Sequence, residues 1–142
     1  MRALFDVNML LALFDVDHVH HGSAIAWWTD KQGHGWASCP LTQNGFVRVI
    51  SQSSYPRPVS VAEAAAALRA QTEVSSHEFW PDDISIADPD IFDHGRILGT
   101  NQLTDIYLLA LAVKNNGRLA TFDRTIPLAA VRGAGPRHLA VL

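Results

Sequence analysis

The order of apolar and polar positions predicts short strands and helices that alternate along the chain. Residues 3–5 form an apolar run that ends in an acid, as a buried strand does, and residues 7–14 continue as an apolar stretch expected to be helical. Further helices are predicted over residues 17–31, 41–52, 60–72, 88–98 and 103–115. Further strands are predicted over residues 36–39, 83–87, 118–122 and 138–142.

Local signals at helix starts support several of these assignments. Ser60 and Glu63 have the spacing of a capping box, in which each side chain satisfies a backbone donor at the start of a helix. Asp17 is a candidate cap, and the pair Asp88-Pro89 is typical of a helix start. Strands that alternate with helices predict a three-layer α/β/α fold, with a central parallel sheet of about five short strands covered on both faces.

The composition agrees with one globular domain over residues 1–142. Hydrophobic residues make up 48%, which is enough to form a core and excludes a disordered tail. The longest apolar runs, residues 7–14 and 106–113, are much shorter than the roughly 18 residues of a membrane span. Asp6 interrupts the N-terminal region before a signal peptide forms, and the single Cys39 fits a reducing compartment as a small buried hydrophobe. We therefore expect a cytoplasmic protein.

Charge is distributed unevenly. The formal net charge of −3 argues against a chain coated in basic residues to hold nucleic acid. Residues 73–93 carry acids and no Lys or Arg, whereas the residues beyond 93 are mainly basic. A basic region near a few isolated acids is compatible with a phosphate ligand beside a metal ion, and equally with an ordinary solvated surface.

Three acids are predicted at one edge of the sheet. Asp6 and Asp123 each end an apolar strand, and Asp105 lies in the first turn of the most apolar helix, which leads into the strand before Asp123. Ligands of open parallel sheets bind at the carboxyl ends of the strands. Clustered carboxylates repel one another unless a cation neutralises them, so the pattern predicts a site for Mg²⁺ or Mn²⁺.

Each of these acids also has a structural explanation when it is taken alone. Asp105 is a first-turn acid of the kind that the helix dipole favours, Asp6 is a candidate cap for the next helix, and Asp123 is a candidate turn residue. Only their joint placement favours a site. His18, His20 and His21 suggest zinc, but they lack a cysteine or a His-Glu-x-x-His pattern, so a surface or packing role is favoured.

Five stretches of the chain, taken together, form a specific pattern. They are residues 4–13, the histidines at 18–21 before Trp27-Trp28, and residues 39–49, 103–112 and 119–123. With these stretches the sequence resembles a PIN-domain ribonuclease over its whole length, and within that family the VapC-type toxin of bacterial toxin–antitoxin pairs. In this resemblance Asp6, Asp105 and Asp123 match the metal-binding acids of the family.

The resemblance also identifies a departure. The family usually places a glutamate on its third helix, where this chain has Gln43 and Asn44, so either amide is a candidate metal ligand or helix cap. The implied reaction is hydrolysis of an RNA phosphodiester bond by a water activated on Mg²⁺ or Mn²⁺. Arg48 and Arg124 are candidate phosphate contacts, with a plain solvated surface as the alternative.

The implied partners are an RNA substrate, a small antitoxin protein that covers the acidic pocket, and a second copy of the chain in a homodimer; no membrane is implied. The rival interpretation is a catalytically weak or silent PIN-like module that binds RNA or protein, its third-helix acid lost. A phosphatase-like α/β domain is disfavoured, because Asn8 occupies the position of its second aspartate.

Overall fold

A five-stranded parallel sheet forms the centre of the computed structural model, which describes residues 1–74 and 76–142, with the side chain of Val74 left aside. The strand order is β3-β2-β1-β4-β5. The strands are β1 (Ala3–Phe5), β2 (Trp36–Ser38), β3 (His77–Phe79), β4 (Arg118–Thr121) and β5 (Leu139–Val141). The predicted α/β/α architecture with about five short parallel strands is therefore confirmed.

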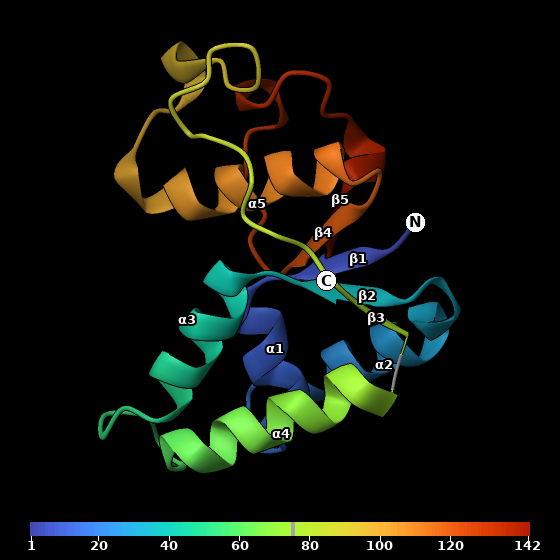
Figure 1. Cartoon of the computed structure of the whole chain (residues 1–142), viewed down its shortest axis with the longest axis vertical. Helices are drawn as coiled ribbons and strands as arrows, with labels where there is room; N and C mark the ends of the chain where they lie inside the picture. Colours follow the sequence, from blue (N-terminus) through green and yellow to red (C-terminus); the bar gives the residue numbers. More distant parts are fainter. Residues whose placement is uncertain (75) are drawn as a thin grey trace.

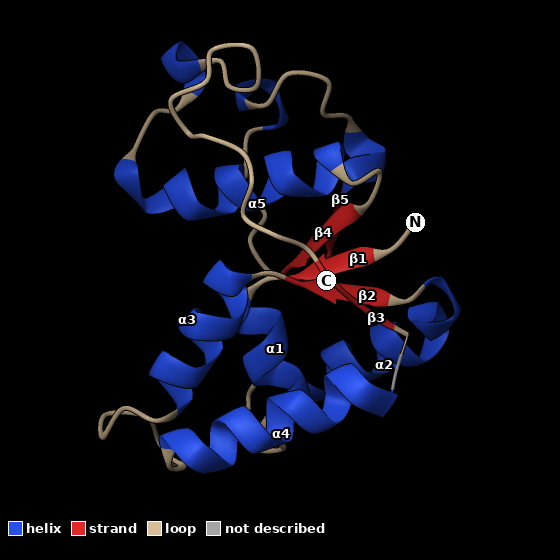
Figure 2. Ribbon diagram, viewed as in Figure 1, coloured by secondary structure: helices blue, strands red, loops and turns tan. Residues whose placement is uncertain are grey.

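Helices cover both faces of this sheet (Figure 1). One face is covered by α1 (Val7–Phe14), α2 (His21–Lys31), α3 (Pro40–Ile50) and α4 (Val61–Val74), and the other by α5 (Leu103–Lys114). Figure 2 shows that long loops and short turns complete the α5 layer. The two layers bury separate apolar clusters, one containing Phe5, Trp36 and Phe46, the other containing Leu4 and Leu119.

The pairing of the strands places β1, near the start of the chain, beside β4, near its end. Leu4 of β1 lies opposite Ala37 of β2 on one side and opposite Leu119 of β4 on the other. Because all five strands are parallel, their carboxyl ends meet at one edge. Residues that follow β1 and β4 are consequently neighbours, as the sequence predicted.

Several helix ends form as their signals predicted. The Ser60 hydroxyl oxygen accepts a hydrogen bond from the Glu63 backbone N–H at 3.1 Å, which starts α4. Asp6 accepts from the Met9 backbone N–H at 2.7 Å and thereby caps α1. After α5, Asn116 adopts a positive φ of 53° and Gly117 follows it into β4, so the predicted stop is confirmed.

The third strand was predicted at the wrong place. It is β3, His77–Phe79, whereas residues 83–87 contain no strand. β3 lies at the edge of the sheet, where His77 is half-buried and Glu78 and Phe79 are exposed, so its sequence lacks an apolar run. Ile84, by contrast, packs against the α5 layer from a loop, and it contributed the apolar signal that indicated a strand.

Two predicted helix starts are also wrong. The segment 88–98 is not an α-helix and contains only a short 3-10 turn at His94–Arg96. The Asp88 carboxylate accepts from the Asp90 N–H at 2.8 Å, which is a local turn that resembles a cap in sequence. Helix α2 starts at His21, not at Asp17, whose carboxylate instead forms an ion pair with Arg57 at 2.7 Å.

In the part of the chain that the structure describes, no helix has both the length and the apolar character needed to span a bilayer.

Candidate active site

Asp6 is the most deeply buried acid at the carboxyl edge of the sheet. It directly follows β1 and has only 4% of its surface exposed. Its carboxylate accepts hydrogen bonds from the Met9 N–H and from the Thr121 hydroxyl. Burial, helped by the negative charge of Asp123, nevertheless raises the pKa of Asp6 to about 6. The charged form of Asp6 is thus held at a cost that a nearby cation would remove.

Asp123 lies two residues beyond β4 and forms a turn of its own. Its Oδ1 accepts from the Thr125 N–H at 2.7 Å and from the Thr125 hydroxyl at 2.6 Å. These two bonds, made to the charged form, lower the pKa of Asp123. The Asp123 N–H in turn donates to the Thr121 hydroxyl oxygen at 3.0 Å. Thr121 therefore contacts two acids of the cluster at once.

Asp105 enters the cluster from the first turn of α5. Burial raises its pKa to about 6, and the charges of Asp6 and Asp123 add to that shift. Asp105 also hydrogen-bonds with Asp123, an arrangement that raises the pKa of Asp105 and lowers that of Asp123. The three acids that the sequence singled out therefore lie in electrostatic contact.

Gln102 fixes how α5 meets the loop after β4, and sequence reasoning missed it. Its amide Nε2 donates to the Thr125 carbonyl at 2.7 Å and to the Thr125 hydroxyl oxygen at 3.2 Å. Thr125 is the same residue that holds the Asp123 carboxylate. The only sequence signal for Gln102 was its place three residues before Asp105, on the same helical turn.

The cluster is not a closed metal cage. Within residues 1–74 and 76–142, no three His, Cys, Asp or Glu side chains are arranged so that they enclose an ion as they stand. The aspartates are neighbours whose mutual repulsion a bound cation would relieve. Their carboxylate oxygens are the donors that hard divalent cations prefer.

The two amides proposed as replacements for a glutamate lie elsewhere. The Gln43 amide donates to the Ser38 hydroxyl at 2.9 Å, and Ser38 is itself hydrogen-bonded to His77 at 2.7 Å. Asn44 is exposed on α3 and, with Gln43, lines a hollow of about 320 Å³ between α3 and α4. Their predicted contact with a metal ion has no support among these contacts.

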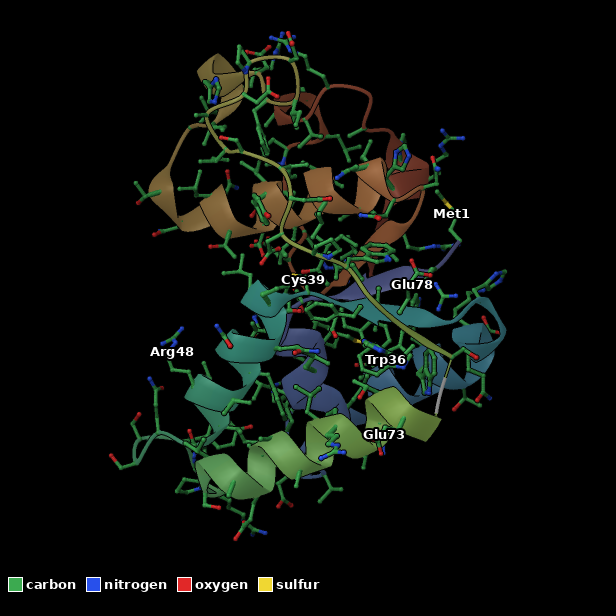
Figure 3. The ribbon with its side chains drawn as sticks, viewed as in Figure 1. Met1, Trp36, Cys39, Arg48, Glu73 and Glu78 are labelled. Carbon is green, nitrogen blue, oxygen red and sulfur yellow. The ribbon has the colours of Figure 1, made fainter. Side chains whose placement is uncertain are left out.

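The two predicted phosphate-binding arginines differ in their position. Arg124 is exposed and directly follows Asp123, so it lies beside the acids. Arg48 is also exposed, and it projects outward from the side of α3 into solvent (Figure 3). Arg124 is therefore the better placed of the two for a substrate at the cluster.

The three histidines serve the start of α2. His21 Nδ1 is hydrogen-bonded to the Ala12 carbonyl at 2.7 Å, and the His20 N–H donates to His18 Nδ1 at 3.0 Å. The His20 ring stacks on Phe122, with ring centroids 4.4 Å apart and 16° between the planes. These contacts agree with the packing role favoured from the sequence.

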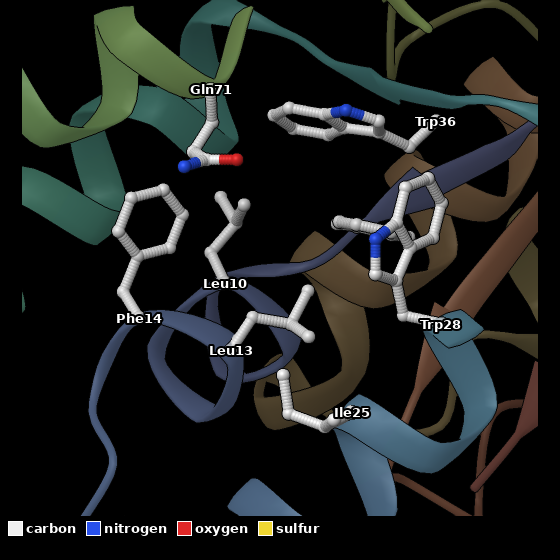
Figure 4. Close-up of a pocket in the computed structure, with 8 residues that line it drawn as sticks. Leu10, Leu13, Phe14, Ile25, Trp28, Trp36 and Gln71 are labelled. Carbon is white, nitrogen blue, oxygen red and sulfur yellow. The ribbon is translucent and has the colours of Figure 1, made fainter. Parts of the chain in front are cut away.

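An apolar groove opens on the layer that contains α1, α2 and α4, and none of the three acids lines it. It has a volume of about 420 Å³ and lies between α1, α2 and α4 (Figure 4). The aromatic and aliphatic residues that line it, together with one amide, are Phe5, Leu10, Leu13, Phe14, Ile25, Trp28, Trp36 and Gln71. Such a groove is the kind of surface that receives the apolar face of a partner helix.

Comparisons with known proteins identify close relatives. The PIN domain family matches residues 3–132. Ribonuclease VapC44 of Mycobacterium tuberculosis is 56% identical over 142 residues, which is all of both chains. Ribonuclease VapC39 of the same species is 40% identical over 134 residues, covering 94% of this chain and 96% of that protein. Ribonuclease VapC38 is 43% identical over 122 residues, covering 85% and 84%.

A solved structure shares the fold at low sequence identity. The crystal structure of VapBC2 from Rickettsia felis, bound to a DNA fragment from its promoter, includes a chain that matches with a TM-score of 0.58 and 13% identity. The match covers 88% of this chain and 90% of that one. It supports the fold described above.

Proposed function

Since this chain belongs to the PIN domain family and, by its full-length relatives, to the VapC group within it, we propose that it is a metal-dependent endoribonuclease toxin. The reaction is hydrolysis of an RNA phosphodiester bond by an activated water. The observation that carries the proposal is the contact of Asp6, Asp105 and Asp123 at one edge of the sheet. We also propose that residues 1–142 form one domain.

The donor set fits a hard divalent ion, Mg²⁺ or Mn²⁺. Two carboxyl groups with a pKa near 6 ionise at neutral pH against burial and mutual repulsion, and a divalent cation offsets both. Asp6, Asp105 and Asp123 would hold the ion. When bound, such an ion lowers the pKa of a coordinated water and polarises the phosphate.

Each residue around the acids has a separate task. The Thr121 hydroxyl orients Asp6, while Thr125 and Gln102 fix Asp123 relative to the start of α5. Fixed oxygens of this kind reduce the reorganisation needed when charge develops on the phosphate. Arg124 contacts the RNA backbone, which positions the strand without reading its sequence.

The missing glutamate leaves three acids instead of four. The Gln43 side chain contacts Ser38. A glutamate at position 43 would strengthen metal binding only if its side chain turned toward the acids. We therefore expect one ion to bind to the protein alone, and a second ion to bind only together with the RNA phosphate.

The antitoxin protein expected to cover the acidic pocket is also the partner proposed for the apolar groove, to which it would present an amphipathic helix. The groove is bordered by Trp28 and Trp36, and Ile25 at its rim is 40% exposed. Aromatic side chains of this kind anchor protein–protein interfaces. The structural neighbour is a VapBC assembly, which supports a protein partner for this chain.

A homodimer is proposed as well. Leu98 is 87% exposed, and Leu41 and Leu103 are each 40% exposed. A second copy of the chain that packed on these side chains would remove them from water. Analytical ultracentrifugation of the purified protein measures the oligomeric state, and a monomer at micromolar concentration contradicts the dimer. We place the protein in the cytoplasm, where its RNA substrates are.

The test of the proposed activity is cleavage of RNA by the purified protein. We expect cleavage with Mg²⁺ or Mn²⁺, its loss with EDTA, and its loss in Asp105→Asn, which removes charge while keeping shape. Asp83→Asn is the matched control, because Asp83 is exposed and its partner is Lys114.

The rival hypothesis, a silent module that binds RNA or protein without cleaving it, makes a different prediction. In that case the protein binds single-stranded RNA, and no metal ion produces fragments. Equal cleavage by the wild type and by Asp105→Asn contradicts the assignment of the acids. The cleavage would then come from a contaminating nuclease.

A further inference from the structure

A stacked pair of rings borders the acid cluster and takes no part in the mechanism above. The rings of His20 and Phe122 lie nearly parallel, 16° apart, with centroids separated by 4.4 Å. Phe122 directly precedes Asp123 in the chain and is half-buried. His20 is exposed, so the stack has one end in the core and the other in solvent.

The turn that carries His20 is held in place by the residues on either side of it. The His20 N–H donates to His18 Nδ1 at 3.0 Å, the Ala24 N–H donates to the His20 carbonyl at 2.9 Å, and His21 is hydrogen-bonded to the Ala12 carbonyl. The His20 backbone is thus fixed at the start of α2. Among the described residues, the His20 ring has no hydrogen-bond partner. It contacts the rings of His18 and Phe122.

A third ring, that of His18, lies near His20 without stacking on it. The His18 ring lies 5.8 Å from the His20 ring and is tilted by 42°, which is an open arrangement and not a face-to-face stack. His20 is the exposed ring of the three, and it stacks on Phe122, which directly precedes Asp123. Single-stranded RNA is recognised on surfaces of this type, where unpaired bases stack on Phe, Tyr, Trp or His.

We propose that His20, backed by Phe122, is a stacking site for a nucleobase next to the cleaved phosphate. The proposal rests on the proposed function, since it concerns the RNA held at the acids. The place of the stack supports it: Phe122 directly precedes Asp123, one of the three acids, and the Phe122 ring holds the exposed His20 ring by stacking at 4.4 Å. A phosphate at Asp123 therefore leaves the neighbouring base within reach of these rings.

The site selects an unpaired base, not a particular sequence. Every nucleobase has a face that can stack, so the contact favours single-stranded loops over duplex RNA and tolerates base changes. His20 would then act on binding and on the position of the strand, while the acids act on the reacting phosphate. This division gives a test that separates the two roles.

The experiment compares His20→Ala, His20→Phe and Val19→Ala. His20→Phe keeps a ring without its nitrogens, and Val19 is a neighbouring control with 87% of its surface exposed. Binding of a short single-stranded RNA is measured in EDTA by fluorescence anisotropy, and kcat and KM are measured with metal. The RNA carries 2-aminopurine beside the cleaved bond, since its fluorescence is quenched when the base stacks.

We expect His20→Ala to bind this RNA about 5- to 100-fold more weakly, the range found when a base–aromatic stack is removed. KM rises in proportion, kcat changes by less than about twofold, and the quenching of 2-aminopurine is lost. His20→Phe restores affinity and quenching, and Val19→Ala behaves as the wild type. Circular dichroism checks that each variant is folded.

Two results overturn the proposal while the proposed function stands. The first is wild-type affinity and quenching in His20→Ala when the wild type cleaves the RNA. The second is a loss of binding in His20→Phe as large as that in His20→Ala, because the ring nitrogens and not stacking would then be responsible. A wild type that neither binds nor cleaves RNA refutes both proposals.

Discussion

Charged side chains at the two edges of the parallel sheet differ in whether they have partners of opposite charge within the chain. At the amino edge, Arg2 Nη1 donates to the carbonyls of Ser76 at 2.7 Å and Trp36 at 3.3 Å, and its Nε lies 3.2 Å from a carboxylate oxygen of Glu78. At the carboxyl edge, burial and, to a smaller extent, repulsion between the acids raise the pKa values of Asp6 and Asp105. The charge of Arg2 is compensated within the chain, and the charges of the acids are not.

This difference separates stability from function. A group that is satisfied within the chain contributes to the folded state and has little left to offer a ligand. An uncompensated buried charge lowers stability and is available to bind a cation. Substitutions at the carboxyl edge should therefore affect activity and stability in opposite directions, whereas those at the amino edge should affect stability alone.

The largest expected effect is that of Asp6→Asn. Asparagine keeps the shape and still caps α1, but it removes the charge, so RNA cleavage should fall by about 10³-fold, since metal catalysis supplies several kcal/mol. The free energy of unfolding of the metal-free protein at pH 7 should rise, by up to about 3 kcal/mol for a pKa raised to about 6. Urea titration measures it. A clear loss of stability contradicts the contrast between the two edges.

The second prediction concerns pH. In the metal-free protein the pKa of Asp6 is about 6, against 3.8 ordinarily, so between about pH 4 and 6 the folded state binds more protons than the unfolded state. The stability contributed by protonated Asp6 is present below about pH 4 and is lost as the pH rises through 6. Burial lowers the pKa values of His18 and His77, so the stability that these groups contribute rises with pH in a similar range.

The two effects are separated by comparing the wild type with Asp6→Asn at each pH. The stability advantage of Asp6→Asn should be small at pH 4 and should grow up to pH 7, as measured by urea unfolding in EDTA. A constant difference across this range would mean that Asp6 is not perturbed by the fold. Added Mn²⁺ should reduce the difference, because it binds the charged form.

A smaller effect is expected from packing at the amino edge. A Cβ on Gly117 would lie 2.7 Å from the Arg2 carbonyl oxygen and 2.6 Å from the Trp80 ring, so the backbone would have to shift. Gly117→Ala should lower the free energy of unfolding by about 1–3 kcal/mol, as overpacking does, without a specific effect on kcat. Gly22→Ala is the control, since nothing lies within 4 Å of its Cβ position.

The smallest effect is expected for Glu78→Gln. The pair of Arg2 and Glu78 is partly exposed, so its loss should cost less than about 1 kcal/mol and depend on salt. Glutamine retains an oxygen that accepts the Trp80 indole N–H, which lies 2.8 Å from Glu78 Oε1. Thermal unfolding at low and high salt measures the difference. A large loss would show that the amino edge depends on this charge more than its exposure indicates.

The fold was predictable where a local signal and a buried face agree. Ser60 caps α4, Asp6 caps α1, and the apolar residues of β1 and β4 are buried in the sheet. In these segments the same residues determine both the local structure and the tertiary contacts. Local consistency of this kind makes a pattern reliable.

The segment between β3 and α5 was mispredicted because its apolar residues serve contacts that are distant in sequence. Phe92 is fully buried and pairs with Val131, and the Asp93 N–H donates to the Ala130 carbonyl at 3.0 Å. Residues buried from a loop have no period that a sequence reveals. β3 was missed for the converse reason, since an edge strand needs few apolar residues.

The site followed the same rule. Asp6, Asp105 and Asp123 were identified because each adjoins a strongly apolar segment, whose position in a parallel sheet is fixed by topology. The contact of Gln43 with Ser38 depends on the rotamer of a long side chain, which helical spacing does not determine. Gln102 and Thr125 act through their hydrogen bonds to a loop, and no apolar segment marked them.

The pairing of β1 with β4 has a consequence for the synthesis of the protein. Leu4 pairs with Leu119 in the centre of the sheet, although the two residues lie far apart in the sequence. The ribosome therefore makes β1 and Asp6 long before it makes β4 and Asp123. On the ribosome, a growing chain has β1, its helices and Asp6 in place before β4 exists. The three acids cannot come together until β4 has emerged and inserted beside β1. Truncated or stalled products that lack β4 should therefore be inert, and activity should appear only with the last steps of folding.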